Sequence, residues 1–293
     1  MVANGTAIDA RDDDGRTALM HATFLRHTEI VELLVANGAA IDECDAKGRT
    51  ALICAASEGH REVVELLVAN GAAIDVRSND GQTALVYAAY FGHREIVDLL
   101  VANSAAIDVR SNNGRTALMH AASEGHREVV ELLVANGAAI DVLDDRGRTA
   151  LVYAAYYGHR EIVELLVANG AAINVRSNDG HTALVYAAYF GHREIVKILV
   201  ANGAAIDARS RHGWTALMHA ACDGHTEIVE LLLANGAAID ARDANDWTAL
   251  LCAASEGHRE VVQFLVANGA GINGTDLQTA LIFAIKRGQL DIV

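Results

Sequence analysis

The 293-residue sequence lacks proline altogether, and aromatic residues make up only 5% of it. Without proline, no X-Pro bond can slow folding by cis–trans isomerisation. No apolar run approaches the roughly 18 residues of a membrane-spanning helix, so we expect no membrane insertion. The first five residues carry neither a basic leader nor an apolar stretch, so we expect no signal peptide and a cytoplasmic location.

Positive charge and cysteine are also scarce. The chain holds 23 Lys and Arg against 38 Asp and Glu, a net charge of −15. This charge argues against a nucleic-acid partner, whose phosphates attract positive charge. The cysteines are scattered without a C-x-x-C pair, which predicts reduced thiols in a cytosolic protein: Cys44, Cys54, Cys222 and Cys252.

The chain repeats itself with a period of 33 residues. The tripeptide Thr-Ala-Leu recurs at this interval from Thr17 to Thr248, and a ninth copy at Thr279 follows after 31 residues. Residues 12–273 form eight units, which start at 12, 45, 78, 111, 144, 177, 210 and 243. Residues 1–11 and 274–293 are read as partial units, so residues 1–293 are expected to be one repeat domain.

Each unit contains signals for two short helices. Thr83 is a candidate N-cap for a helix over 84–91, and Gly92 ends that helix. A second helix is expected over 94–103, usually closed by Asn-Gly. The polar stretch from Ile107 to Gly114 suits a β-hairpin. Ser104 replaces the closing glycine in one unit, which predicts local strain.

The pattern resembles the ankyrin repeat family across essentially the whole chain. The resemblance rests on the 33-residue period and on the segments G-x-T-A-L, A-A-x-x-G-H-x-E-I-V-x-L-L and N-G-A-A-I-D. It implies an all-α repeat solenoid, a stack of helix pairs with projecting β-hairpins, which binds partners through hairpin tips and first helices. One departure is consistent: the family's T-P-L-H becomes T-A-L followed by Met, Ile, Val or Leu.

Aromatic residues gather on one face of the first helices in three units. On a helical wheel they lie opposite the core residues, at places where another unit has His120, Ser123 and Glu124. Because an unpaired Glu is hardly ever buried, we expect this face to meet water and to bind a partner. The alternative is that the rings stack on neighbouring repeats and stiffen the array. The residues concerned are Tyr87, Tyr90, Phe91, Tyr153, Tyr156, Tyr157, Tyr186, Tyr189 and Phe190.

The residue before each capping threonine gives a second line of candidates. It is mostly Arg in the N-terminal units and becomes Trp214 and Trp247 near the C-terminal end. In the ankyrin family this position lines the binding groove, and Trp is a common interface anchor. Packing of each Trp over a hairpin base is the alternative.

Sequence signals for chemistry are weak. The histidine of each Gly-His pair recurs once per unit, too far from its copies to share a metal ion, and is assigned a structural hydrogen bond. A G-x-G-x-x-G match at 269–274 follows a helix, whereas a dinucleotide site follows a strand. His219, Cys222 and Cys252 lie close enough to suggest zinc or a Cys/His dyad, but they lack a fourth ligand and an oxyanion donor. We therefore expect no metal, cofactor or catalysis.

These observations predict a non-catalytic scaffold or adaptor that binds a protein or peptide along a concave groove. The alternative is a fragment of a longer array, or a rod that self-associates through uncapped ends, because the chain starts inside a unit and stops midway through a second helix. An enzyme is the weakest interpretation.

Overall fold

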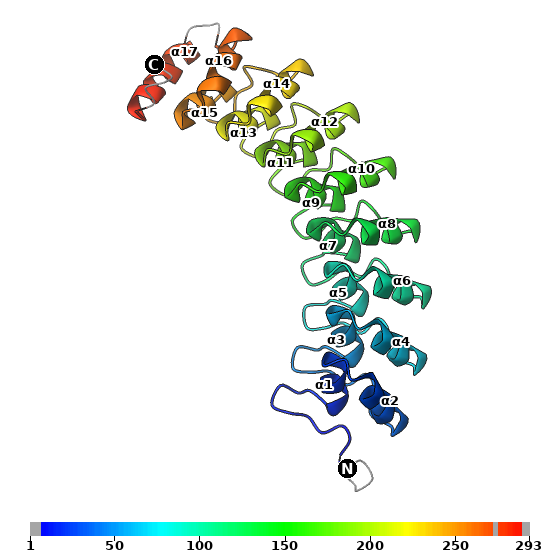
Figure 1. The fold of residues 1–293 in the computed structure, drawn as a ribbon. Coiled ribbons are helices and arrows are strands. Elements are labelled where there is room, and N and C mark those ends of the chain that lie inside the picture. The colour runs from blue at the N-terminus through cyan, green and yellow to red at the C-terminus, as the bar shows by residue number, and fades with distance from the viewer. Residues whose placement is uncertain (1–6, 272–274, 289–293) are drawn as a thin grey trace. The chain divides into compact units, whose positions relative to one another are not determined.

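The computed structural model describes residues 7–271 and 275–288, and it divides the chain into two compact units, Met1–Asp145 and Arg146–Val293. In each unit the odd-numbered helices form one row and the even-numbered helices a second row beside it (Figure 1). The first unit contains α1 (Ala18–Phe24), α2 (Thr28–Ala36), α3 (Ala51–Glu58), α4 (Arg61–Ala69), α5 (Ala84–Tyr90), α6 (Arg94–Ala102), α7 (Ala117–Glu124) and α8 (Arg127–Ala135). The second contains α9 (Ala150–Tyr157), α10 (Arg160–Ala168), α11 (Ala183–Tyr189), α12 (Arg193–Ala201), α13 (Ala216–Cys222), α14 (Thr226–Ala234), α15 (Ala249–Glu256), α16 (Arg259–Ala267) and α17 (Thr275–Lys286).

A threonine caps each first helix of a pair. Thr83 has extended backbone geometry, and its Oγ1 accepts a hydrogen bond from the backbone N–H of Val86 at 3.4 Å. The same bond recurs at every capping threonine from Thr17 to Thr248. It satisfies one of the N–H groups that a helix start leaves unpaired, and it confirms the predicted N-cap.

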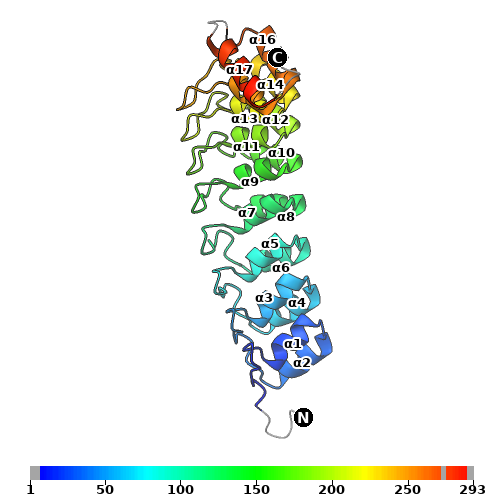
Figure 2. The same ribbon diagram turned by 90° about the vertical axis from the view of Figure 1, so that its left-hand side faces the viewer.

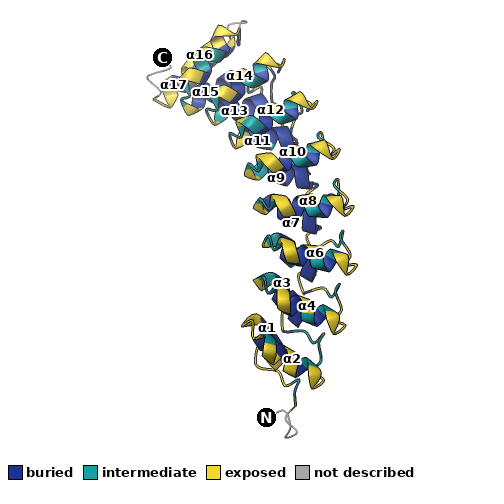
Figure 3. Cartoon of the chain, turned by 45° about the vertical axis from the view of Figure 1, so that its right-hand side comes forward, coloured by how far each residue is buried: buried dark blue, intermediate teal, exposed yellow. Residues whose placement is uncertain are grey.

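Small apolar residues hold neighbouring helices together. In α5 the side chains of Leu85, Ala88 and Ala89 are buried, and in α6 those of Val97 and Leu100 are buried. In each unit the buried residues lie where helices face one another, and the exposed residues run along the outer edges (Figure 3). Burying a Val or Leu side chain contributes about 1.5–3 kcal/mol, so these short helices depend on their neighbours for stability.

A residue in the left-handed backbone region closes each second helix. Gly71 follows α4 with φ of 85°, and Ser104 follows α6 with φ of 67°. A Cβ atom built on Gly71 would meet no atom within 4 Å. Space therefore does not require glycine here, and the predicted strain at Ser104 lies in its backbone conformation.

Two sets of hydrogen bonds join neighbouring repeats within each compact unit. His126 Nε2 donates to the carbonyl oxygen of Tyr90 at 3.0 Å, and equivalent bonds are made by His60, His93, His192, His225 and His258. A Cβ at Gly92 would approach the His126 ring to 2.5 Å, so glycine leaves the imidazole its space. In the second set, Asp75 Oδ1 accepts from the Ala106 N–H at 3.0 Å, 31 residues later. The structural role predicted for the Gly-His histidines is confirmed at these six positions.

The loops gather on one side of the helices in each unit (Figure 2). Within 7–271 and 275–288 they form turns without β-strands, so the expected β-hairpins are not confirmed. Ser78 N–H donates to the carbonyl oxygen of Gln82 at 2.9 Å, as a hairpin requires, but the Gln82 N–H returns to the Ser78 side-chain Oγ at 3.2 Å. The side chain thus occupies the donor that would extend a backbone ladder.

The ninth Thr-Ala-Leu copy differs from the others. It lies inside α17, where Thr279 Oγ1 donates to the carbonyl oxygen of Thr275 at 2.8 Å instead of capping a helix. α17 packs against α15. Of the expected partial units and the 269–274 glycine motif, residues 1–6, 272–274 and 289–293 lie outside the described residues.

Candidate interaction surface

The aromatic residues predicted to bind a partner occupy three positions of the first helices. We call the fourth, seventh and eighth residues after the capping threonine the inner, middle and outer positions. In the repeat of Thr83 these are Tyr87, Tyr90 and Phe91. The three positions differ strongly in exposure.

Outer positions are exposed throughout the described repeats. Among the aromatic residues, Phe91 is 48% exposed, Tyr157 53% and Phe190 38%. Exposed carboxylates occupy the same position in other repeats: Glu58, Glu124, Asp223 and Glu256. The expectation that this face meets water therefore holds for the outer position.

Apart from the exposed His21, the inner positions of the capped first helices are buried or half-buried. Tyr153 is only 3% exposed, and the Arg148 guanidinium lies 4.5 Å above its ring, so the predicted exposure of Tyr153 is wrong. Tyr87 and Tyr186 are half-buried. The error has a geometric cause, since an exposed outer residue says little about a residue one turn earlier on the same helix.

Middle positions contact the inner position of the next repeat. The ring centroids of Tyr90 and His120 are 5.5 Å apart, those of Tyr156 and Tyr186 are 5.4 Å apart, and those of Tyr189 and His219 are 5.2 Å apart. Aromatic pairs at such distances add about 0.5–1.5 kcal/mol beyond burial. Stacking of rings on neighbouring repeats, the alternative interpretation, therefore also describes the molecule.

The second unit joins several rings into one aromatic cluster, which we define as Tyr156, Tyr157, Tyr189, Phe190 and His219. Tyr156 bridges to Tyr157 at 4.7 Å and to Phe190 at 4.4 Å, and Phe190 continues to Tyr189 at 4.6 Å. Tyr157, Tyr189 and Phe190 are exposed, while Tyr156 is half-buried. Contacts among the rings fix their orientation and leave one side of each outer ring open.

The two tryptophans are half-buried beside the loops. Trp214 Nε1 donates to Asp243 Oδ2 at 2.9 Å, and its ring lies 4.9 Å from that of His219. The backbone N–H of Trp247 donates to Asp243 Oδ1 at 2.8 Å. Trp214 thus ties its repeat to the next loop, as the alternative interpretation expected, and it still presents part of its ring to solvent.

Three imidazoles lie among these rings. Burial lowers the pKa of His120 to about 3 and that of His219 to about 4, with smaller contributions from the charges of Arg115 and His181 respectively. Burial also lowers the pKa of His181. Neutral imidazoles at these places keep the face uncharged near pH 7. His120 and His219 share the inner position with Tyr87 and Tyr186, and this position was the available sequence signal, but it did not reveal that His120 is buried and His219 half-buried.

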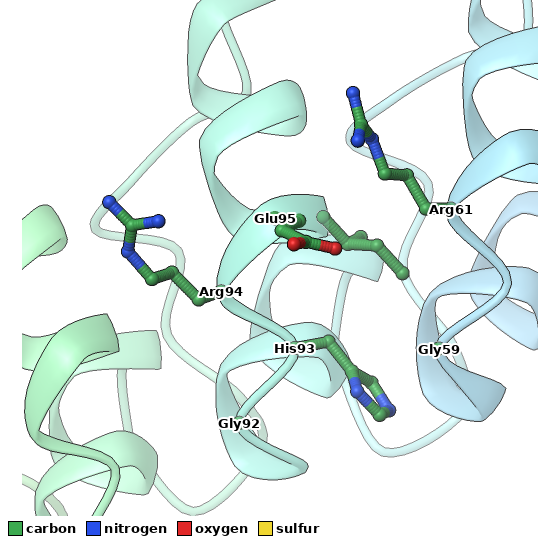
Figure 4. A pocket seen from close by; sticks show the side chains of 7 residues that line it. Gly59, Arg61, Gly92, His93, Arg94 and Glu95 are labelled. Carbon is green, nitrogen blue, oxygen red and sulfur yellow. The ribbon is translucent and has the colours of Figure 1, made fainter.

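Metal or catalytic chemistry would use the histidine, cysteine and carboxylate side chains. Among the described residues, no group of three His, Cys, Asp or Glu side chains could hold a metal ion. Cys222 and Cys252 are free thiols, and so are Cys44 and Cys54. A hollow beside the starts of α4 and α6 is lined by Arg61, His93, Arg94 and Glu95 with three other residues, and both arginine side chains extend away from the His93 ring (Figure 4). It contains none of the predicted binding residues.

Over the part of the chain that the structure describes, no helix is both long enough and apolar enough to cross a membrane.

Known protein families include one whose model matches this chain. A family model described as ankyrin repeats (3 copies) matches residues 1–78, 67–144, 136–210, 203–276 and 241–293. The overlapping matches extend from the first residue to the last. A comparison with curated proteins gave no match.

Proposed function

Because the chain belongs to the ankyrin repeat family, we propose that it is a non-catalytic scaffold or adaptor that binds a protein partner across its first helices. Ankyrin repeats generally mediate protein–protein interactions. A cytosolic location fits the four free thiols and belongs to the same proposal.

The observation that carries the proposal is the open side of the aromatic cluster. Tyr157, Tyr189 and Phe190 remain 53%, 42% and 38% exposed although contacts with neighbouring rings already restrict their movement. Exposed rings held in this way bury a large apolar area on binding and lose little rotamer entropy. Phe91 provides a smaller site of the same kind in the first unit.

Charge and spacing define the partner's chemistry. Along the second unit the outer positions run from Tyr157 and Phe190 to the exposed carboxylates of Asp223 and Glu256. Packed helices lie about 8–10 Å apart, and an extended peptide covers that distance in about three residues. We therefore propose an extended partner segment with two apolar side chains three residues apart, followed at the same interval by Lys or Arg.

Selection of displayed random peptides on the purified full chain tests this proposal. Selected peptides should carry the apolar and basic pattern, and should bind Tyr157→Ala and Phe190→Ala variants at least about tenfold more weakly, the size of an interface anchor. Val266→Ala is the matched control, since Val266 is 41% exposed in the same unit but lies on α16. Failure to select peptides, or equal affinity for the aromatic variants, would overturn the proposal.

A second candidate function is self-association, which two exposed apolar faces favour. Ile30 and Leu33 of α2 are 46% and 57% exposed, and Ile282 and Ile285 of α17 are 50% and 57% exposed. The residue equivalent to Ile30 in the next repeat, Val63, is fully buried. A second copy, or a further repeat of a longer array, would cover such faces in the same way.

Light scattering on the purified chain tests the self-association. The apparent mass should rise with protein concentration, and the double variant Ile30→Glu, Leu33→Lys should remain monomeric while keeping its helical circular dichroism. A constant monomer mass for the wild-type chain would exclude self-association.

A further inference from the structure

Two thiols meet where neighbouring repeats of the second unit pack together. Cys222 is the last residue of α13 and occupies a middle position, and Cys252 occupies the inner position of α15. The same relationship places the rings of Tyr189 and His219 5.2 Å apart in the preceding repeat pair. Helix α13 packs against α15, so Cys222 and Cys252 occupy the corresponding neighbouring positions of this repeat pair.

The backbone around Cys222 is well fixed. Its carbonyl oxygen accepts a hydrogen bond from His258 Nε2 at 2.7 Å, which joins the end of α13 to the start of α16. A disulfide requires Cα atoms about 4.4–6.8 Å apart, and the packing of α13 against α15 keeps the two helix backbones adjacent.

The two thiols differ in accessibility and in acidity. Cys222 is half-buried, whereas Cys252 is 1% exposed. The hydrogen bond with Cys252 lowers the pKa of Cys222, although burial and the carboxylates of Asp223 and Glu256 oppose this shift. The same hydrogen bond, together with burial, raises the pKa of Cys252. Cys222 is thus the thiol that reacts first, because the thiolate is the nucleophile.

We propose that Cys222 and Cys252 form a site of reversible oxidation, where a hydroperoxide converts the two thiols into a disulfide between α13 and α15. The Cys222 thiolate attacks one peroxide oxygen, the O–O bond breaks, and the departing hydroxide takes a proton to become water when the oxidant is hydrogen peroxide. Cys222 is then a sulfenic acid. Cys252 loses its proton and its sulfur attacks the Cys222 sulfur, and the S–O bond breaks to release a second water. Two thiols and one hydrogen peroxide thus give one disulfide and two waters.

The other two cysteines serve as internal references. Burial raises the pKa of Cys54, which is 6% exposed at the inner position of α3. Burial and nearby carboxylates also raise the pKa of Cys44, whose Sγ lies 3.7 Å from the carbonyl oxygen of Asp42 in a loop. Neither environment favours the thiolate, so both should react more slowly than Cys222.

Mass spectrometry of the full chain tests the site. Trypsin cleaves after Arg242 and so separates the two cysteines into different peptides. After treatment of the reduced protein with hydrogen peroxide, the two peptides should be found joined, with the loss of two hydrogen atoms, and a dithiol should separate them again. The double variant Cys44→Ser, Cys54→Ser should form the same link.

Single variants distinguish the two roles. Cys252→Ser should stop at a sulfenic acid on Cys222, which dimedone traps, and Cys222→Ser should leave Cys252 reduced. Unchanged far-ultraviolet circular dichroism checks that each variant keeps its fold. Absence of the joined peptides from the folded wild-type protein, a link only between separate molecules, or oxidation of Cys54 as fast as Cys222 would overturn the proposal.

Discussion

His192 Nε2 lies 3.2 Å from the backbone carbonyl oxygen of Tyr156, 36 residues earlier in the chain. The imidazole at the start of one second helix thereby holds the end of the preceding first helix, at the point where the aromatic cluster begins. Packing alone would leave this helix end with an unpaired carbonyl.

His192→Ala should lower the free energy of unfolding by about 1–2 kcal/mol, because it leaves the Tyr156 carbonyl without its partner. Urea unfolding followed by circular dichroism measures the change. His212→Ala, at an exposed loop position, is the control and should change stability by less than about 0.5 kcal/mol. Equal losses in both variants would show that the interrepeat hydrogen bond contributes little.

Tyr153→Ala and Tyr157→Ala should differ sharply in stability. Tyr153 is buried beneath Arg148, so its loss should cost about 3 kcal/mol or more, as for other buried aromatic residues. Tyr157 is 53% exposed, so Tyr157→Ala should lower the free energy of unfolding by less than about 1 kcal/mol. The same urea experiment measures both. Similar losses would contradict the difference between inner and outer positions.

Ser104→Gly should stabilise the protein by about 1 kcal/mol, because glycine adopts the positive φ of 67° without the steric cost that serine meets. The matched change in the opposite direction is Gly137→Ser, where φ is 84° and a Cβ meets no atom within 4 Å. It should destabilise by a similar amount. Thermal unfolding of the two variants measures the direction of both stability changes. A loss of stability in Ser104→Gly would show that the backbone at Ser104 is not strained.

Acid should destabilise the protein through His120 and His219. Their pKa values in the folded state, about 3 and about 4, lie below the unfolded value of about 6.5. The unfolded chain therefore binds protons first as pH falls below about 6.5, and stability decreases until the folded-state pKa values are reached. Each imidazole contributes at most about 3 kcal/mol of loss between pH 7 and pH 4.

His120→Tyr and His219→Tyr test this pH dependence, since tyrosine occupies the same inner position in other repeats. Both variants should lose less stability than the wild-type chain between pH 7 and pH 4, whereas His212→Tyr should behave like the wild type. Urea midpoints at a series of pH values provide the measurement. Parallel curves for all four proteins would contradict the assignment.

Much of the fold could be predicted from the sequence because its signals are local. The capping threonine, the glycine after each helix and the 33-residue period each specify structure within a few residues or by repetition. The loops were harder to predict, because the Ser78 side chain replaces one bond of the expected hairpin. The interaction surface was predicted only in part. Exposure at Tyr157 followed from Glu124 at the same position, but burial of Tyr153 depends on how adjacent helices are offset.

The constant offsets of the interrepeat bonds have a consequence for the gene. The backbone carbonyl oxygens of Phe24, Ser57 and Tyr90 each accept a hydrogen bond from a histidine 36 residues later. Within either of the two compact units, removal of any 33-residue segment would place a histidine and a carbonyl group at the same 36-residue separation, so that they could form the same hydrogen bond. Unequal recombination would therefore add or remove whole repeats from the coding sequence, and the new neighbours would still form the interrepeat hydrogen bond.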